Sequence, residues 1–147
     1  MEQKGKAGRK AQVYDPVRKK YVALTPEERV RQFVIRFLHT ECGVPWGHIS
    51  VENPMQLYER NFRTDLQVRN RQGEAVMVIE CKRPEIPLDE KVLEQAMRYN
   101  LGGHEKFVAV TNGMEFKCYA AGMQDGKRIW VEKDRFPNWS ELTENRK

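Results

Sequence analysis

The sequence predicts a single α/β domain, in which a mixed β-sheet is flanked by helices in the order helix, three strands, helix, strand. A length of 147 residues with 39% hydrophobic residues suits one domain with one modest core. Two segments have apolar residues at helical spacing, and the segments between and after them have the short apolar runs and turn residues of strands. Such an order is typical of helices packed on a mixed sheet.

The net charge of +5 is concentrated near the N-terminus, where residues 1–20 hold seven Lys or Arg and two acidic residues. Residues 21–147 contain equal numbers of basic and acidic residues. Residues 1–12 are polar and lack periodicity, which predicts a disordered basic tail before a domain at residues 13–147. The tail could bind a phosphate backbone through counterion release, or it could only aid solubility.

The first elements of the domain are expected to be a small hairpin and a helix. Residues 13–14 and 21–24 flank a segment of turn composition at residues 15–18. A helix should then run from Thr25, as N-cap, to about Cys42. On a helical wheel Glu27 lies at the edge of the apolar stripe and faces the interior, whereas Glu28 points away. The stripe consists of Val30, Phe33, Val34, Phe37 and Leu38.

The sheet is expected to form from several short segments. Residues 49–52 and 62–69 have strand composition, and a turn at residues 71–73 leads into residues 75–82. This last strand is apolar at consecutive positions, which predicts a central strand covered on both faces. A helix containing Leu88, Val92, Ala96 and Tyr99 follows. Residues 107–111 and 116–120 should form two further strands, and residues 129–131 an edge strand.

Cysteine and histidine patterns argue against several classes of site. Three cysteines without a C-x-x-C pair indicate reduced thiols, and the three histidines lack metal-ligand spacing. Any metal should therefore be bound by oxygen. The longest apolar stretch has five residues and no secretory signal is visible, so we expect a cytoplasmic protein without a membrane partner.

The candidate site lies at the end of the central strand. Glu80 and Lys82 project to one face because they are two residues apart, and the backbone carbonyl of Cys81 lies at the same edge. Asp65 can face them from the hairpin-connected strand. Two carboxylates and a carbonyl are hard oxygen ligands that suit Mg²⁺ or Mn²⁺. With Lys82 to orient hydroxide and offset negative charge, the site could hydrolyse a phosphodiester.

Neighbouring residues extend this hypothesis, and alternatives stay open. Gln95 and Tyr99 share one helix face and could bond the carboxylates, a phosphate or Lys82. The simpler alternative is a structural ion pair between Glu80 and Lys82. An ATPase is excluded, since the chain has no G-x-x-x-x-G-K-[ST] loop. Four arginines near the Asp65 strand could contact DNA phosphates or form a solvated face; they are Arg60, Arg63, Arg69 and Arg71.

The ordered combination of these motifs resembles the N-terminal nuclease domain of type I restriction enzyme R subunits. The resemblance covers about residues 13–121 and implies a restriction-endonuclease-like PD-(D/E)xK core, with Thr64 in place of the motif's proline. It implies that Asp65 and Glu80 bind metal and that Lys82 is catalytic. The motifs are the run from residue 24 to 32, Asp65, residues 79–82, Gln95 with Tyr99, and Thr111-Asn112-Gly113.

The resemblance also implies further roles and partners. Glu27 would be the first-helix acid, with Glu28 as its rival, and Gln95 with Tyr99 would support the site and contact DNA. The substrate would be DNA, cut by a Mg²⁺-dependent endonuclease reaction. Other restriction-modification subunits or a helicase motor are candidate partners, although the sequence encodes no motor. The alternative on the same fold is a non-catalytic nucleic-acid-binding or assembly module.

Overall fold

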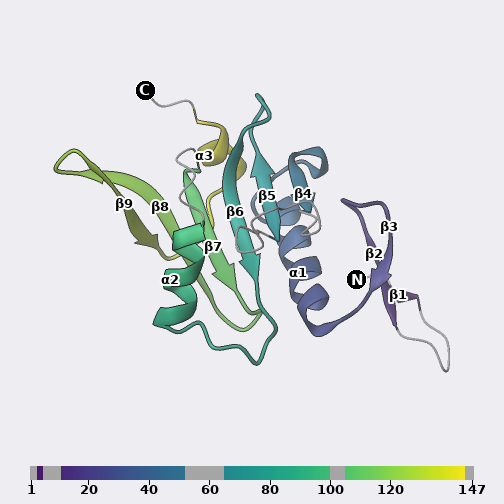
Figure 1. The fold of residues 1–147 in the computed structure, drawn as a ribbon. Coiled ribbons are helices and arrows are strands. Elements are labelled where there is room, and N and C mark those ends of the chain that lie inside the picture. The colour runs from purple at the N-terminus through teal and green to yellow at the C-terminus, as the bar shows by residue number, and fades with distance from the viewer. Residues whose placement is uncertain (1–2, 5–10, 52–64, 100–104, 145–147) are drawn as a thin grey trace.

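The computed structural model describes residues 3–4, 11–51, 65–99 and 105–144. Its main sheet has six strands in the order β4-β5-β6-β7-β8-β9 (Figure 1). β6 and β7 are parallel and the other neighbours are antiparallel, so the predicted mixed α/β fold is confirmed. The strands are β4 (Ile49–Val51), β5 (Leu66–Arg69), β6 (Ala75–Cys81), β7 (Phe107–Thr111), β8 (Phe116–Gln124) and β9 (Lys127–Lys133).

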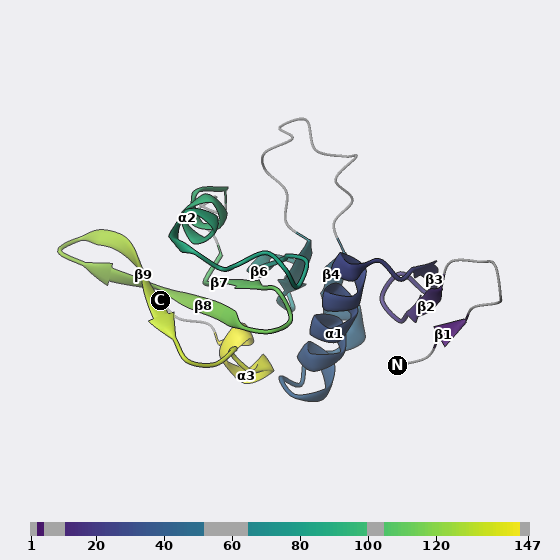
Figure 2. The same cartoon turned by 90° about the horizontal axis from the view of Figure 1, so that it is seen from below.

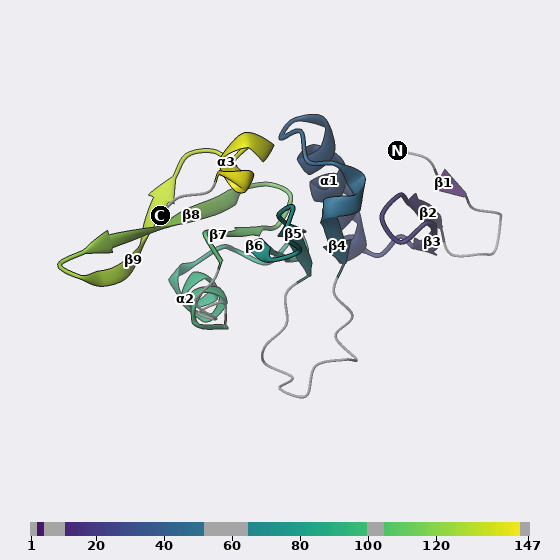
Figure 3. The ribbon, with the colours of Figure 1, turned by 90° about the horizontal axis from the view of Figure 1, so that it is seen from above.

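Helices cover both faces of this sheet. α1 (Pro26–Thr40) and the short α3 (Trp139–Thr143) lie on one face, while α2 (Glu90–Tyr99) lies on the other (Figures 2 and 3). α2 connects the parallel strands β6 and β7, as a crossover between parallel strands requires. A 3-10 turn, Trp46–His48, leads from α1 into β4. Both faces of the central strands are therefore shielded from water.

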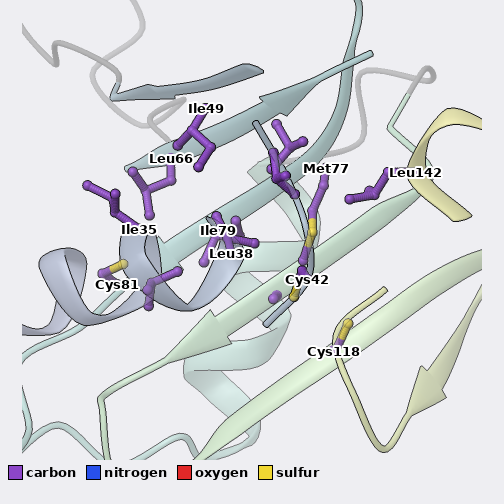
Figure 4. Packing of buried hydrophobic residues seen from close by; sticks show 14 of the residues in the cluster. Ile35, Leu38, Cys42, Ile49, Leu66, Met77, Ile79, Cys81, Cys118 and Leu142 are labelled. Atoms are coloured by element: carbon purple, nitrogen blue, oxygen red, sulfur yellow. The ribbon is translucent and has the colours of Figure 1, made fainter. Parts of the chain in front are cut away.

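The main core lies between α1 and the sheet (Figure 4). Ile35 and Leu38 of α1 pack against Met77 and Ile79 of β6, and all four are fully buried. A smaller cluster under α2 joins Leu88, Ala96 and Val110. Because β6 is buried from both sides, its apolar residues are consecutive, as predicted for a central strand.

Helix α1 begins where the sequence predicts, but two of its residues do not have the burial that the sequence predicts. The Oγ1 atom of Thr25 accepts a hydrogen bond from the Glu28 amide at 3.1 Å. Phe33, expected in the apolar stripe, is 60% exposed. Glu28, expected to point away, is only 6% exposed, so that prediction is wrong. The stripe is displaced toward Gln32 and Ile35, which are fully buried.

A separate three-stranded sheet explains the displaced stripe. It contains β1 (Gln3–Lys4), β2 (Gln12–Asp15) and β3 (Lys20–Ala23), and the predicted hairpin is its β2–β3 pair. Gln32 Nε2 of α1 donates to the carboxylate of Asp15 at 3.0 Å, and Arg36 donates to the Tyr14 carbonyl at 2.9 Å. The hairpin thus covers the side of α1 that helical periodicity alone leaves open to solvent.

Some expectations fall outside the described residues or were missed. Most of the predicted tail lies outside the described residues, as do residues 52 and 62–64 of the predicted strands. Within the tail, Gln3–Lys4 and Gln12 take part in strands. The disorder of residues 1–12 otherwise stays a prediction. The predicted strand at residues 129–131 is longer, at Lys127–Lys133. α3 was not predicted. Across the described residues, no helix is long and apolar enough to cross a membrane.

Candidate functional site

Glu80 and Lys82 meet at the carboxyl end of β6. Lys82 Nζ lies 2.6 Å from Glu80 Oε2, and the two side chains are 27% and 14% exposed respectively. The Lys82 amide donates to the Thr111 carbonyl at 2.8 Å, which extends the pairing with β7 past the end of β6. The other oxygen, Glu80 Oε1, is buried with no hydrogen-bond partner among the described residues. A buried carboxylate oxygen normally accepts a hydrogen bond or contacts a cation, and Glu80 Oε1 does neither among the described residues.

Asp65 comes to the same end of the sheet from β5. Leu66 is paired with Ile79, so by continuing the antiparallel register the backbone of Asp65 lies opposite Glu80. Asp65 Oδ2 accepts a hydrogen bond from the Cys81 amide at 2.7 Å. Its Oδ1 accepts one from Arg31 Nη2 at 2.9 Å, and the residue is 8% exposed. The two predicted carboxylates therefore lie on adjacent chain segments, but Asp65 is engaged by α1.

The donor set suits an oxygen-seeking cation, though it is incomplete. Asp65 and Glu80 supply carboxylate oxygens, of which Glu80 Oε1 has no partner in the described part of the chain. Within that part, no group of three or more His, Cys, Asp or Glu is positioned to hold a metal. A cation here would draw its other ligands from the Cys81 carbonyl, water and phosphate, as Mg²⁺ commonly does.

The Cys81 side chain is buried in the main core. The residue is 1% exposed, and burial raises the pKa of its thiol well above the usual value, with a further contribution from the Asp65 carboxylate. Burial likewise raises the pKa of Cys42 to about 11 and that of Cys118 to about 12. All three cysteines are free and buried, as predicted for reduced thiols.

Both candidate first-helix acids contact Arg31. Glu27 Oε1 lies 3.0 Å from Arg31 Nη2, and its side chain is 35% exposed. Glu28 is the more buried of the two, with Oε1 2.5 Å from Arg31 Nη1 and Oε2 2.6 Å from Arg18 Nη2. Arg31 contacts Asp65 as well as both glutamates, so a single guanidinium group connects each glutamate to the candidate site.

The predicted helix pair is only partly described. Gln95 is an exposed residue of α2, and Tyr99 is the last residue of that helix, with its side chain outside the described part. α2 packs through Ala96 against Val110, which is the strand partner of Glu80. The helix thus covers the sheet face next to the site, while the roles of Gln95 and Tyr99 stay predictions.

The two predicted DNA-contacting arginines that the structure describes, Arg69 and Arg71, lie away from the site. Arg69 ends β5, about 13 Å along the strand from Asp65 at the usual rise per residue. It donates to the Gly73 carbonyl and the Gln67 side chain, and Arg71 lies over the Trp139 ring at 5.8 Å. Arg60 and Arg63 lie outside the described residues. DNA contact by any of the four stays a prediction.

A turn with a buried asparagine, Asn112, follows β7 and supports the site. Asn112 Nδ2 donates to the Ile86 carbonyl at 2.7 Å, and its Oδ1 accepts from the amides of Met114 and Glu115. Gly113 has φ +88°, and a Cβ there would lie 3.2 Å from Val30 of α1. The turn therefore fixes the loop that follows Lys82 and lies against the first helix.

Arg31 and Arg18 belong to this region but were not predicted as members of it. Arg31 had a signal, because it follows Glu28 by three residues and Glu27 by four, the spacings at which helical ion pairs form. Arg18 had none, since its contact with Glu28 joins a turn to a helix ten residues away.

The match to a known family covers all of the described helices and strands except β1 to β3 and α3. Residues 26–137 match the family described as the type I restriction enzyme R protein N terminus. The chain belongs to this family. A search of curated proteins found no match. The matched region runs from the start of α1 to just before α3, so the R protein N-terminal unit contains Asp65, Glu80 and Lys82. Membership is consistent with a nuclease-like module.

Proposed function

We propose that this R protein N-terminal domain is a Mg²⁺- or Mn²⁺-dependent DNA endonuclease whose site contains Asp65, Glu80 and Lys82. The observation that carries the proposal is the pair at the end of β6, where a lysine contacts a glutamate whose second oxygen is buried without a partner among the described residues. The pairing with Lys82 uses Glu80 Oε2, which leaves Oε1 to contact a cation. Family membership is consistent with a nuclease-like module over residues 26–137, which include this strand.

Each residue would have a distinct part in phosphodiester hydrolysis. Asp65, Glu80 and the Cys81 carbonyl would hold the divalent cation, which when bound polarises the scissile phosphate and acidifies a coordinated water. Lys82 has three ammonium hydrogens, so it can stay paired with Glu80 and still donate to a phosphate oxygen or orient hydroxide. Its charge would offset negative charge that develops in the transition state.

The remaining predicted residues would act on the substrate or its partners. Gln95 and Tyr99 would support the site and contact DNA, and Glu27 would be the first-helix acid. The arginines and the basic tail would bind phosphates without selecting a base sequence. Because R proteins belong to restriction enzymes, other restriction-modification subunits or a helicase motor are the partners we propose.

A plasmid-nicking assay with Mg²⁺ or Mn²⁺ tests the assignment of the carboxylates. Asp65→Asn and Glu80→Gln should each lower nicking by about a hundredfold or more, since a neutral amide binds these cations poorly. Glu132→Gln is the matched control, because Glu132 also pairs with a lysine on the sheet, at 3.2 Å, but on β9. Nicking by all variants at the wild-type rate would refute the assignment.

A non-catalytic DNA-binding or assembly module is the second candidate, and one observation favours it. Both oxygens of Asp65 already accept hydrogen bonds, and no three-ligand group is assembled among the described residues. Such a module would need a partner to complete the site. It predicts that the wild-type chain binds duplex DNA but cuts it with neither metal, and that binding is unchanged in Glu80→Gln.

A further inference from the structure

Arg31 lies at the centre of a cluster of three carboxylates. Its Nη1 contacts Glu28 at 2.5 Å, and its Nη2 contacts both Glu27 at 3.0 Å and Asp65 at 2.9 Å. The side chain is 12% exposed, and its Nε is buried with no partner in the described residues. One guanidinium therefore contacts acids from α1 and from the start of β5.

The Arg31 side chain is positively charged at neutral pH. Burial alone would lower its pKa, but the neighbouring Asp65 and Glu28 carboxylates outweigh burial and raise the pKa above the usual value. Arginine cannot give up its proton near neutral pH, so the cluster always contains this positive charge. A second cation at the Asp65 carboxylate would be repelled by the guanidinium that already contacts Oδ1, in a partly desolvated site where screening is weak.

We propose that the positively charged Arg31 side chain competes with the divalent cation for the Asp65 carboxylate. This inference rests on the proposed function. Cation binding would then require Arg31 Nη2 to release Asp65 Oδ1. The guanidinium need not enter solvent, because Glu28 and Glu27 continue to hold its two amino groups. Arg31 is thus a positioning residue: it keeps the metal-free carboxylate ordered and lowers the affinity of the site for metal.

A Mn²⁺ titration of the full chain, followed by the electron paramagnetic resonance signal of free Mn²⁺, tests this competition. Arg31→Gln should bind Mn²⁺ about tenfold more tightly than wild type, a coupling of ordinary size between two bound groups. Arg36→Gln is the matched control on the same helix. Arg36 donates to Gln32 Oε1 and the Tyr14 carbonyl rather than to a carboxylate, so its loss should leave Mn²⁺ affinity unchanged.

A measurement on the wild-type protein covers the case in which Arg31→Gln does not fold. The side-chain nitrogen signals of Arg31 should shift on saturation with Mg²⁺, while those of Arg36 stay in place. Mn²⁺ binding by Arg31→Gln that is equal to or weaker than wild type, or unmoved Arg31 signals at saturating Mg²⁺, would overturn the competition and leave the proposed nuclease site standing. Absence of cation binding in both wild type and Arg31→Gln would overturn both proposals.

Discussion

The Asp65 carboxylate is hydrogen-bonded to the backbone of Cys81, whose amide donates to Asp65 Oδ2 at 2.7 Å. The bond joins the start of β5 to the end of β6, and both residues are buried. Asp65 therefore has a structural task in addition to its proposed metal contact. Loss of activity in an Asp65 variant must be separated from loss of stability.

Asp65→Ala should lower the free energy of unfolding by about 3 kcal/mol, because it leaves the buried Cys81 amide without its acceptor and removes one of the three carboxylates that contact Arg31. Asp65→Asn keeps an acceptor and should cost less. Urea denaturation measures both. Glu85→Ala is the control, since the exposed Glu85 lies 3.7 Å from Arg83 and should contribute less than about 0.5 kcal/mol. Equal stability of Asp65→Ala and wild type would contradict the described contacts.

Glu27 and Glu28 can be distinguished by comparing stability with nicking. Glu28→Gln should destabilise the domain by about 2 kcal/mol, because buried contacts to Arg18 and Arg31 are weakened. Glu27→Gln, at a half-exposed position, should cost about 0.5 kcal/mol or less. If Glu27 is the first-helix acid, Glu27→Gln will lose nicking while remaining folded. Full nicking by this variant would transfer the role to Glu28.

Gly113→Ala should cost about 2–3 kcal/mol, since a side chain is strained at φ +88° and its Cβ would crowd Val30 at 3.2 Å. Gly73→Ala is the matched control. Gly73 has φ +83° but no atom within 4 Å of an added Cβ, so only the backbone strain of about 1 kcal/mol applies. The difference in unfolding free energy measures the contact between the turn and α1. It should shrink in a Val30→Ala background.

Asp15 should make the domain sensitive to acid. Burial would raise the pKa of its carboxyl, but hydrogen bonds from Arg18 and Gln32 and the Arg18 charge hold the pKa below the usual value. Its contribution is therefore complete above the unfolded pKa of about 3.9 and is lost as pH falls through the lower folded pKa. Unfolding curves below about pH 4 should be less pH-dependent in Asp15→Asn. The same change at exposed Asp134 should leave that dependence as in wild type.

Local patterns predicted most of the fold, while tertiary contacts account for what they missed. The N-cap at Thr25 and the consecutive apolar residues of β6 are local signals, and both are confirmed. Glu28 was misplaced because the covering hairpin is a tertiary feature. α3 was missed despite a signal, since Asn138 and Glu141 form a capping box that the sequence displays at its three-residue spacing.

The sequence predicted which face of β6 carries Glu80 and Lys82, but not the contacts of the candidate site. Strand periodicity placed Glu80 and Lys82 on one face, and in the structure Lys82 Nζ lies 2.6 Å from Glu80 Oε2. Periodicity could not predict that Asp65 would contact Arg31, since residues 31 and 65 come together only when α1 packs against the sheet. Sequence patterns therefore locate chemical groups along an element, whereas packing between elements decides which groups meet.

The most direct test of the central claim compares Lys82→Ala with Lys117→Ala in a supercoiled plasmid-nicking assay with Mn²⁺. Both lysines pair with a glutamate on the sheet, but only Lys82 lies at the proposed site. We expect wild type and Lys117→Ala to nick the plasmid equally, and Lys82→Ala to be slower by about a hundredfold or more while still binding DNA. Equal nicking by all three proteins, or DNA binding without any nicking by wild type, would contradict the account.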